Sequence, residues 1–286
     1  MNNKLKSPVN IPVEKIRPFE GHPYKVLDNE EMNTLIESIQ EKGVLSPILI
    51  RPLENTVDEY ELISGHRRFR ASVKAGLETV PALIYAVSRD EAAVMLVDSN
   101  LHREHILPSE KAFAYKLKLE SLNHQGKTFG QLGQKYSRDL MAESVNESSR
   151  QIHRYIRLTY LIPELLDMMD EEKIAFSVGV ELSFLDEQLQ YDLLRVIEEQ
   201  ECTPSYSQAW HMHKDFNAGT LTAEAIEDRL MAEKPNQKSM FKVPVEKLQK
   251  IAPKVRDKDY EEFVLKACEH YYKFLQRQRN RDRDAR

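Results

Sequence analysis

Cysteine, tryptophan and long apolar runs are scarce in this sequence, whose 286 residues include two cysteines and one tryptophan. Cys202 and Cys268 are far apart and form no CxxC pair, which excludes a disulfide framework and a cysteine-based zinc site. No stretch of about 18 apolar residues occurs, and the opening MNNKLKSPVNIPVEK holds no apolar targeting segment. We therefore expect a cytoplasmic protein that neither spans nor crosses a membrane.

An excess of basic residues is also missing, because 41 Lys and Arg stand against 46 Asp and Glu, for a net charge of −5. Any contact with nucleic acid must therefore come from a local basic patch. A composition of 41% hydrophobic and 30% charged residues is ordinary for a soluble globular protein. The length predicts about two or three domains.

The segment YELISGHRRFRASVKA, residues 60–75, has the most informative local pattern. Residues 60–63 predict a strand, Gly65 a tight turn and residues 67–75 a helix. A glycine at such a turn lets the backbone approach a ligand closely, and the free N–H groups at a helix start favour anions. Three arginines follow, which together predict polyphosphate binding: Arg67, Arg68 and Arg70. For an isolated GxRR the alternative stays open that these arginines meet carboxylates or water.

Strands and helices alternate around this segment. Residues 10–16, 46–52 and 79–85 predict strands, and a helix begins after Asp28 as its N-cap and ends at Gly43. Such alternation predicts an α/β unit of about a hundred residues.

The second polar motif is SNLHRE, residues 99–104, at the end of a predicted helix. The carbonyl of Asn100 can ligate a divalent cation and Arg103 can bind a phosphate, so these residue types suit a metal-nucleotide site. A solvated helix end is the alternative. A zinc site on the neighbouring histidines is disfavoured, because no HExxH motif and no third ligand are present.

Beyond residue 126 the pattern becomes all helical and predicts a helix-turn-helix. Residues 128–136 form the first helix, 137–144 the turn, and Asn146 caps a second helix that reaches Leu161. Residues 126–160 carry a local charge of about +3. The start of the second helix suits base edges, with Ser148, Ser149, Arg150 and Gln151, and its outer side offers Arg154 and Arg157 to phosphates. An amphipathic core helix with a solvated face is an equally good interpretation of this pattern alone.

Further helices are predicted at residues 163–170, 178–185, 186–199, 205–216 and 222–233, then a linker at 234–239 and a long helix at 259–281. The last helix has one apolar stripe: Val264, Ala267, Cys268, Tyr271 and Leu275. A stripe on so small a unit often needs a partner helix, which makes a homodimer plausible.

Taken together, SPILI, YELISGHRRFRASVKAGLETVPALI, SNLHRE and the helix-turn-helix resemble the ParB partition proteins in order and spacing over residues 9 to about 185. The resemblance implies an α+β fold: a mixed N-terminal CTP-binding domain (1–107), an all-α DNA-binding domain (108–200) and a helical C-terminal region (201–286). It implies binding of CTP and Mg2+ by Gly65, His66, Arg67, Arg68, Ser99, Asn100 and Arg103, with Asn100 at the metal. It also implies a nucleoid-associated dimer that closes as a sliding clamp on a parS-like DNA site and works with a ParA-type ATPase.

Three positions depart from the family pattern. His66 stands where Glu is usual, Tyr24 where a phosphate-contacting Arg is usual, and Ser99 where a Glu assists the metal. Asp98 precedes Ser99, but neighbouring helical residues point about 100° apart. Slow CTP hydrolysis and none at all therefore stay open, as does a plain helix-turn-helix regulator without a nucleotide switch. A sulfiredoxin-like enzyme is disfavoured, because no cysteine lies beside the arginine motif.

Overall fold

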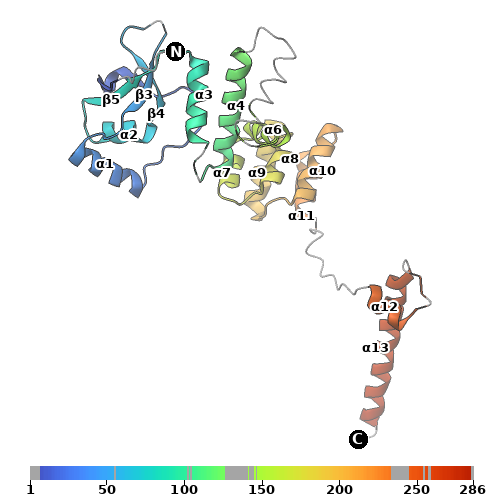
Figure 1. The fold of residues 1–286 in the computed structure, drawn as a ribbon. Helices are drawn as coiled ribbons and strands as arrows, with labels where there is room; N and C mark the ends of the chain where they lie inside the picture. Colours follow the sequence, from blue (N-terminus) through green and yellow to red (C-terminus); the bar gives the residue numbers. More distant parts are fainter. Residues whose placement is uncertain are drawn as a thin grey trace. The chain divides into compact units, whose positions relative to one another are not determined.

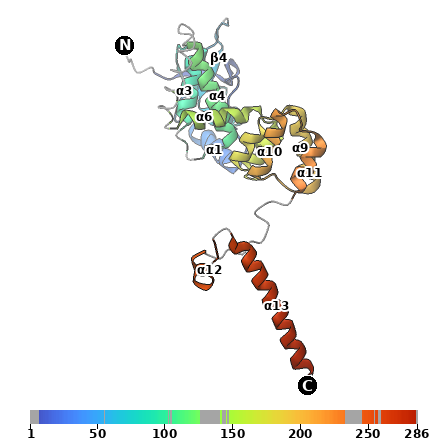
Figure 2. The same cartoon turned by 90° about the vertical axis from the view of Figure 1, so that its right-hand side faces the viewer.

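The structure is a computed structural model that describes residues 7–54, 56–101, 103, 105–125, 141, 145, 147–232, 245–253, 255–256 and 259–284. The chain divides into two compact units, Met1–Ala232 and Glu233–Arg286. In the first unit a mixed sheet with its helices precedes a group of packed helices, and the second unit is helical (Figures 1 and 2). This arrangement confirms the predicted α+β fold class.

A five-stranded mixed sheet forms the centre of the N-terminal domain. Its strands are β1 (Val9–Pro12), β2 (Ile16–Arg17), β3 (Ile48–Pro52), β4 (Tyr60–Ser64) and β5 (Thr79–Ile84), in the order β1-β5-β3-β4-β2. β3 runs parallel to β5 and antiparallel to β4, and β2 runs parallel to β4. The single strand predicted at residues 10–16 is instead two short strands at opposite edges, because a 3-10 turn, Val13–Lys15, separates them.

Helices cover both faces of this sheet, and neighbouring residues of β4 alternate between the faces. Leu62 packs in the cluster that includes Phe69 of α2 (His66–Lys74), whereas Ile63 packs with Leu96 of α3 (Arg89–Asn100). α1 (Glu30–Lys42) lies against α2, as Figure 1 shows. β4 therefore lies between two apolar layers, and α2 begins shortly after its end.

The first turn of α1 differs from the prediction. Asn29 is the N-cap, and its side chain accepts a hydrogen bond of 3.1 Å from the backbone N–H of Met32. Asp28, the predicted cap, pairs instead with Arg70 and Lys74 of α2 at 2.6 and 2.8 Å. The two cations attract this carboxylate, so the next residue takes over the capping.

The helical domain follows with α4 (Pro108–Gln125), which packs on α3, and α6 (Ser149–Arg157), which packs on α4. A short 3-10 turn, Leu158–Tyr160, leads into the bundle. The bundle comprises α7 (Pro163–Asp170), α8 (Phe176–Leu182), α9 (Glu187–Gln200), α10 (Tyr206–Asn217) and α11 (Ala223–Met231). The predicted first helix and turn of the helix-turn-helix, residues 128–144, lie almost entirely outside the described residues.

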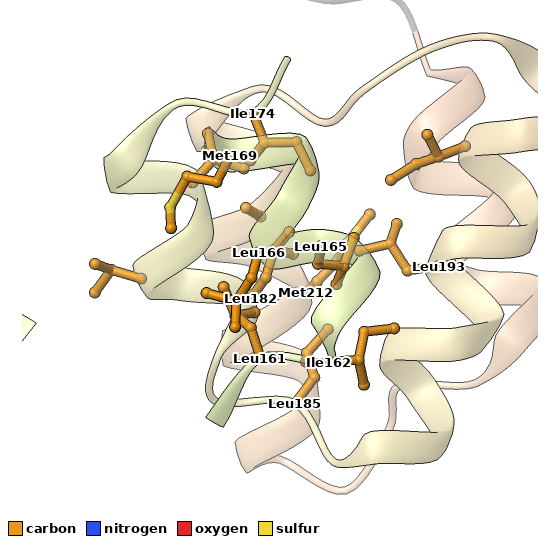
Figure 3. Packing of buried hydrophobic residues seen from close by; sticks show 14 of the residues in the cluster. Leu161, Ile162, Leu165, Leu166, Met169, Ile174, Leu182, Leu185, Leu193 and Met212 are labelled. Carbon is orange, nitrogen blue, oxygen red and sulfur yellow. The ribbon is translucent and has the colours of Figure 1, made fainter. Parts of the chain in front are cut away.

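One apolar core joins the helices of the bundle (Figure 3). Leu165 and Leu193 pack in it together with Met212 of α10 and Ile226 of α11. The helical core therefore extends to Ala232, beyond the boundary predicted at residue 200, because α10 and α11 supply apolar side chains to the same cluster.

The second unit contains α12 (Val245–Ile251) and α13 (Tyr260–Asp284) among its described residues. The hydroxyl of Tyr260 donates to the carbonyl of Ala252 at 3.1 Å and joins the two helices. Beyond this contact α13 exposes large apolar side chains, including Tyr271 and Leu275 of the predicted stripe. The predicted linker at 234–239 lies outside the described residues. Nowhere in the described part of the chain is a helix long and apolar enough to cross a membrane.

Candidate functional site

The two polar motifs of the N-terminal domain meet around one cavity of about 610 Å3. All seven residues predicted to bind nucleotide line it: Gly65, His66, Arg67, Arg68, Ser99, Asn100 and Arg103. The turn after β4 and the first turn of α2 supply the first four residues. Ser99 and Asn100 come from the end of α3, and Arg103 lies just beyond it. Because α3 packs on the sheet beside β4, segments more than thirty positions apart in the sequence come together.

Gly65 forms the turn between β4 and α2 with φ +98° and ψ 28°. A Cβ there would lie 2.9 Å from Cγ2 of Ile48 and 3.1 Å from Nη2 of Arg68. Only glycine fits this backbone conformation and this space without strain. The turn places the unpaired N–H groups at the start of α2 beside the cavity, where they favour an anion.

The three arginines that line the cavity have different partners. Nη1 of Arg68 donates to the carbonyls of Ser46 and Pro47 at 2.5 and 2.7 Å, and burial lowers the pKa of this guanidinium. Arg67 is 43% exposed and pairs with Glu31 at 2.9 Å. The guanidinium of Arg103 lies 5.5 Å from the centroid of the Tyr24 ring. A phosphate can therefore recruit Arg67 and Arg103 more readily than Arg68, which already binds backbone oxygens.

Arg70, the third arginine of the sequence motif, does not line this cavity. Its Nε and Nη2 donate to the two carboxylate oxygens of Asp28 at 2.8 and 2.6 Å. For Arg70 the structure thus supports the alternative of an arginine that meets a carboxylate.

Ser99 and Asn100 close the end of α3 at the cavity. The hydroxyl of Ser99 donates to the carbonyl of Leu96 at 2.9 Å, and Nδ2 of Asn100 donates to the same carbonyl at 2.7 Å. With its amide nitrogen engaged, Asn100 can offer its amide oxygen to a cation. Asp98 does not replace the missing glutamate, because its carboxylate lies 2.5 Å from Nζ of the buried Lys118 on α4.

Two histidine rings in contact with each other lie near Arg103. The rings of His22 and His66 are 3.6 Å apart between centroids. Burial lowers the pKa of His66 to about 3 and that of His22 to about 4, and the Arg103 charge acts in the same direction on both. Nε2 of His66 is buried and has no hydrogen-bond partner among the described residues. Both rings are therefore neutral at pH 7, so neither adds positive charge to the cavity.

The contribution of α1 to this cavity was not predicted from the sequence. Glu31, Thr34, Leu35 and Ser38 line it from one side of that helix. Their spacing of i, i+3, i+4 and i+7 marks one helix face. Leu35 also packs against the apolar cluster of Met32 and Ile39, so the spacing of apolar residues alone does not reveal the cavity-lining face.

The N-terminal domain that carries this cavity also has a recognisable sequence profile. The ParB N-terminal domain family matches residues 2–101. The N-terminal part of the chain belongs to the ParB N-terminal domain family. Apart from Arg103, the residues that line the cavity lie within this matched segment.

Similarity to known proteins continues into the helical domain. The chain is 34% identical over 167 residues to the chromosome-partitioning protein Spo0J of Thermus thermophilus. This matched segment covers 58% of this chain and 56% of that protein. It is 30% identical over 202 residues to the nucleoid occlusion protein of Listeria innocua, and this longer match covers 70% of this chain and 66% of that protein. The chain thus spans between about half and two thirds of these relatives. A match of 202 residues must extend well past residue 101.

One solved structure with a nucleotide is also similar to this chain. It is the C-terminally truncated ParB from Caulobacter crescentus complexed with CTP-gamma-S, at 25% identity, covering 62% of this chain and 92% of that chain with a TM-score of 0.32. A TM-score of this size does not establish a common arrangement of the whole chain.

The predicted DNA-contacting residues lie on α6 and around its start. The helix begins at Ser149, and the hydroxyl of Ser148 accepts from the N–H of Gln151 at 3.2 Å, so Ser148 is the N-cap and the prediction of Asn146 is wrong. Arg150 is exposed, and Nη1 of Arg154 donates to the side-chain oxygen of Gln151 at 3.3 Å. The buried Ile152 packs with Tyr115 of α4. The first turn of α6 thus presents polar side chains, while its opposite face is anchored in the core.

Of the basic residues of α6, Arg150 is exposed, whereas Arg154 is half-buried with its guanidinium 4.9 Å from the centroid of the Phe176 ring, and Arg157 is also turned toward α8. Its Nη2 donates to the carbonyl of Ser183 at 2.7 Å, and its guanidinium lies 4.1 Å from the centroid of the Phe184 ring and 4.5 Å from that of Tyr160. The expectation of an outward Arg157 is corrected, because the end of α6 lies against the end of α8. A phosphate contact by Arg157 stays a prediction, while its observed contacts favour a role in positioning α6.

Proposed function

We propose that this chain is a DNA-binding partition protein whose N-terminal domain binds CTP with Mg2+, and that nucleotide binding closes a dimeric clamp on a parS-like DNA site. A ParA-type ATPase is the partner in this proposal. The observation that carries it is the meeting of all seven motif residues around one cavity at the start of α2. The names of the relatives, a chromosome-partitioning protein and a nucleoid occlusion protein, support the same biological context.

The residues of the cavity fit a magnesium nucleotide. Gly65 provides a close backbone approach at a helix N-terminus, where phosphate oxygens can accept from N–H groups. Arg67 and Arg103 would bind phosphates, and the amide oxygen of Asn100 would face the cation. Bound Mg2+ would neutralise part of the triphosphate charge. The residues themselves bind and orient, and Ser99 offers a hydroxyl where relatives are expected to carry a carboxylate.

The first turn of α6 supports DNA binding. Arg150 is exposed beside Gln151, and both residue types form bidentate contacts with base edges. Arg154 lies one turn further along, where a phosphate contact would set the register. Since the chain as a whole is acidic, these few residues must provide the local attraction.

The exposed apolar side of α13 supports a homodimer. Tyr271 and Leu275 are 61% and 37% exposed within their own unit. A second copy of the helix would remove these side chains from water and so contribute to association.

Calorimetry with the magnesium complexes of CTP, UTP, ATP and GTP tests the nucleotide part. CTP should bind best, and Arg67→Ala should weaken it more than tenfold, because a guanidinium-phosphate contact contributes roughly 1.5–3 kcal/mol. Arg70→Ala is the matched control, since this arginine of the same helix binds Asp28 outside the cavity. DNA binding should survive both changes. If CTP does not bind while specific DNA does, a plain helix-turn-helix regulator is the better assignment.

A further inference from the structure

The loop between β2 and α1 touches the cavity on one side through two aromatic residues. The centroid of the His22 ring lies 3.6 Å from that of His66, with the rings tilted by 32°, and the centroid of the Tyr24 ring lies 5.5 Å from the guanidinium of Arg103. His66 and Arg103 both line the cavity. A ligand that moves either of them would therefore change a contact of this loop.

The next residue of the same loop, Lys25, binds the helical domain. Its backbone N–H donates to Glu110 of α4 at 2.8 Å, and its Nζ donates to Asp167 and Asp170 of α7 at 2.8 and 3.2 Å. Asp170, whose side chain is only 6% exposed, also accepts from the hydroxyl and the N–H of Ser109 in the first turn of α4. We call the contacts of Lys25 with Glu110, Asp167 and Asp170 the Lys25 latch.

α7 connects the latch to the DNA-contacting part of the chain. Leu165, Leu166 and Met169 of α7 lie in the same core as Leu161 (Figure 3). Leu158, the residue that follows α6, belongs to this core as well. Close packing transmits a displacement of one such helix to its neighbours. The path from Arg103 through Tyr24, Lys25 and α7 thus consists of direct contacts and covalent neighbours.

We propose that the Lys25 latch regulates the cavity by stabilising its ligand-free arrangement, an inference that rests on the proposed nucleotide site. A charge-assisted hydrogen bond to phosphate is stronger than the contact between Arg103 and the Tyr24 ring, so an incoming polyphosphate draws Arg103 away from that ring. Tyr24 then shifts with its neighbour Lys25, and the latch opens. By linkage, opening the latch first must tighten ligand binding by the same factor.

Removing the latch should therefore raise nucleotide affinity. Lys25→Met keeps the apolar stem of the side chain and removes its charge. Asp167→Asn removes one charged partner of Lys25 and leaves the hydrogen bond between Asp170 and Ser109 at the start of α4 intact. Each change should tighten CTP-Mg2+ binding in calorimetry by about two- to fivefold, the range expected for half-exposed ion pairs. The double variant should add little to Lys25→Met. Lys173→Met is the control, because this lysine pairs with Glu171 and should leave affinity unchanged.

A purely structural tie between the domains predicts a different result. Lys25→Met and Asp167→Asn would then lower stability and leave CTP affinity unchanged or weaker, which would overturn the proposal. Failure of the nucleotide site itself is recognised separately, because the unmodified protein would not bind CTP in the same titration.

Hydrogen exchange tests the coupling without nucleotide. The amides of Lys25 and Ser109 donate to the side chains of the latch, so their protection reports its closure. Arg103→Ala, which removes the guanidinium from the Tyr24 ring, should accelerate exchange in peptides that contain Lys25 or Ser109. Peptides from α10 serve as the internal reference. Equal exchange in Arg103→Ala and the unmodified protein would show that the cavity and the latch are independent.

Discussion

Replacing Gly65 by alanine should destabilise the N-terminal domain and distort the cavity. The added Cβ would lie 2.9 Å from Cγ2 of Ile48, which is fully buried in the sheet, and 3.1 Å from Nη2 of Arg68. Ile48 cannot move without disturbing the core, and Arg68 is fixed by the carbonyls of Ser46 and Pro47. The clash therefore cannot be relieved by rotation of a free side chain.

Gly76→Ala separates backbone strain from this clash. Gly76 closes the same helix with φ +78° and would meet nothing within 4 Å. Alanine in the left-handed region costs roughly 1–2 kcal/mol, partly offset by roughly 0.4–1 kcal/mol from the less flexible unfolded chain. Overpacking at Gly65 adds roughly 1–3 kcal/mol. Gly65→Ala should therefore reduce the free energy of unfolding by at least about 1 kcal/mol more than Gly76→Ala.

Hydrogen exchange of peptides from β4 and α2 measures this difference locally. The single tryptophan, Trp210, lies on α10. Its fluorescence in a urea titration of each variant therefore reports the stability of the helical domain and serves as an internal reference. Gly65→Ala should accelerate exchange in β4 and α2 and also weaken CTP binding, whereas Gly76→Ala should leave CTP affinity unchanged. Equal destabilisation by the two changes would refute the steric argument.

Four further outcomes can be measured. Arg150→Ala should lower discrimination between a selected site and a random duplex by roughly 1–3 kcal/mol in anisotropy titrations, and an equal loss on both duplexes would contradict base readout. Burial lowers the pKa of His66 to about 3, so below about pH 6.5 the unfolded chain binds a proton that the folded protein does not. The free energy of unfolding should therefore fall on acidification by at most about 1.4 kcal/mol per pH unit. His66→Gln should reduce this slope in urea titrations at different pH values. Ser99→Glu should speed phosphate release from CTP, and an unchanged rate would show that this position does not limit turnover. Tyr271→Asp with Leu275→Asp should lower the mass seen by sedimentation if α13 forms the dimer.

Local sequence patterns were sufficient to predict the strand, turn and helix around which the site is built. The alternation before Gly65, the glycine itself and the helix up to Gly76 predicted β4, the turn and α2 within about one residue. The positive φ at Gly65 explains why such a turn can be recognised in a sequence, since other residues rarely adopt it. The resemblance to ParB proteins then predicted that Ser99, Asn100 and Arg103 share one nucleotide site with the residues of this turn. In the structure both sets of residues line the same cavity.

Contacts between distant segments were not accessible from local patterns. Asp28 has the residue type and spacing of an N-cap, but Arg70 and Lys74, more than forty positions later, attract its carboxylate. Arg157 follows the outward spacing of α6, yet its guanidinium donates to the carbonyl of Ser183, the residue after α8. In both cases the local preference contributes about 1 kcal/mol or less, so one tertiary contact is sufficient to override it.

The charge distribution in the cavity favours binding over hydrolysis as the source of any conformational change. Among the described residues that line it, Glu31 is the one carboxylate; its side chain is 72% exposed and paired with Arg67. Asp98 faces Lys118, and Ser99 donates to a backbone carbonyl, so neither is directed to assist a metal or activate water. A ligand can shift an equilibrium only by its differential affinity for two states. The free energy that opens the Lys25 latch must then come from the contacts of Arg67, Arg103 and the start of α2 with the bound anion.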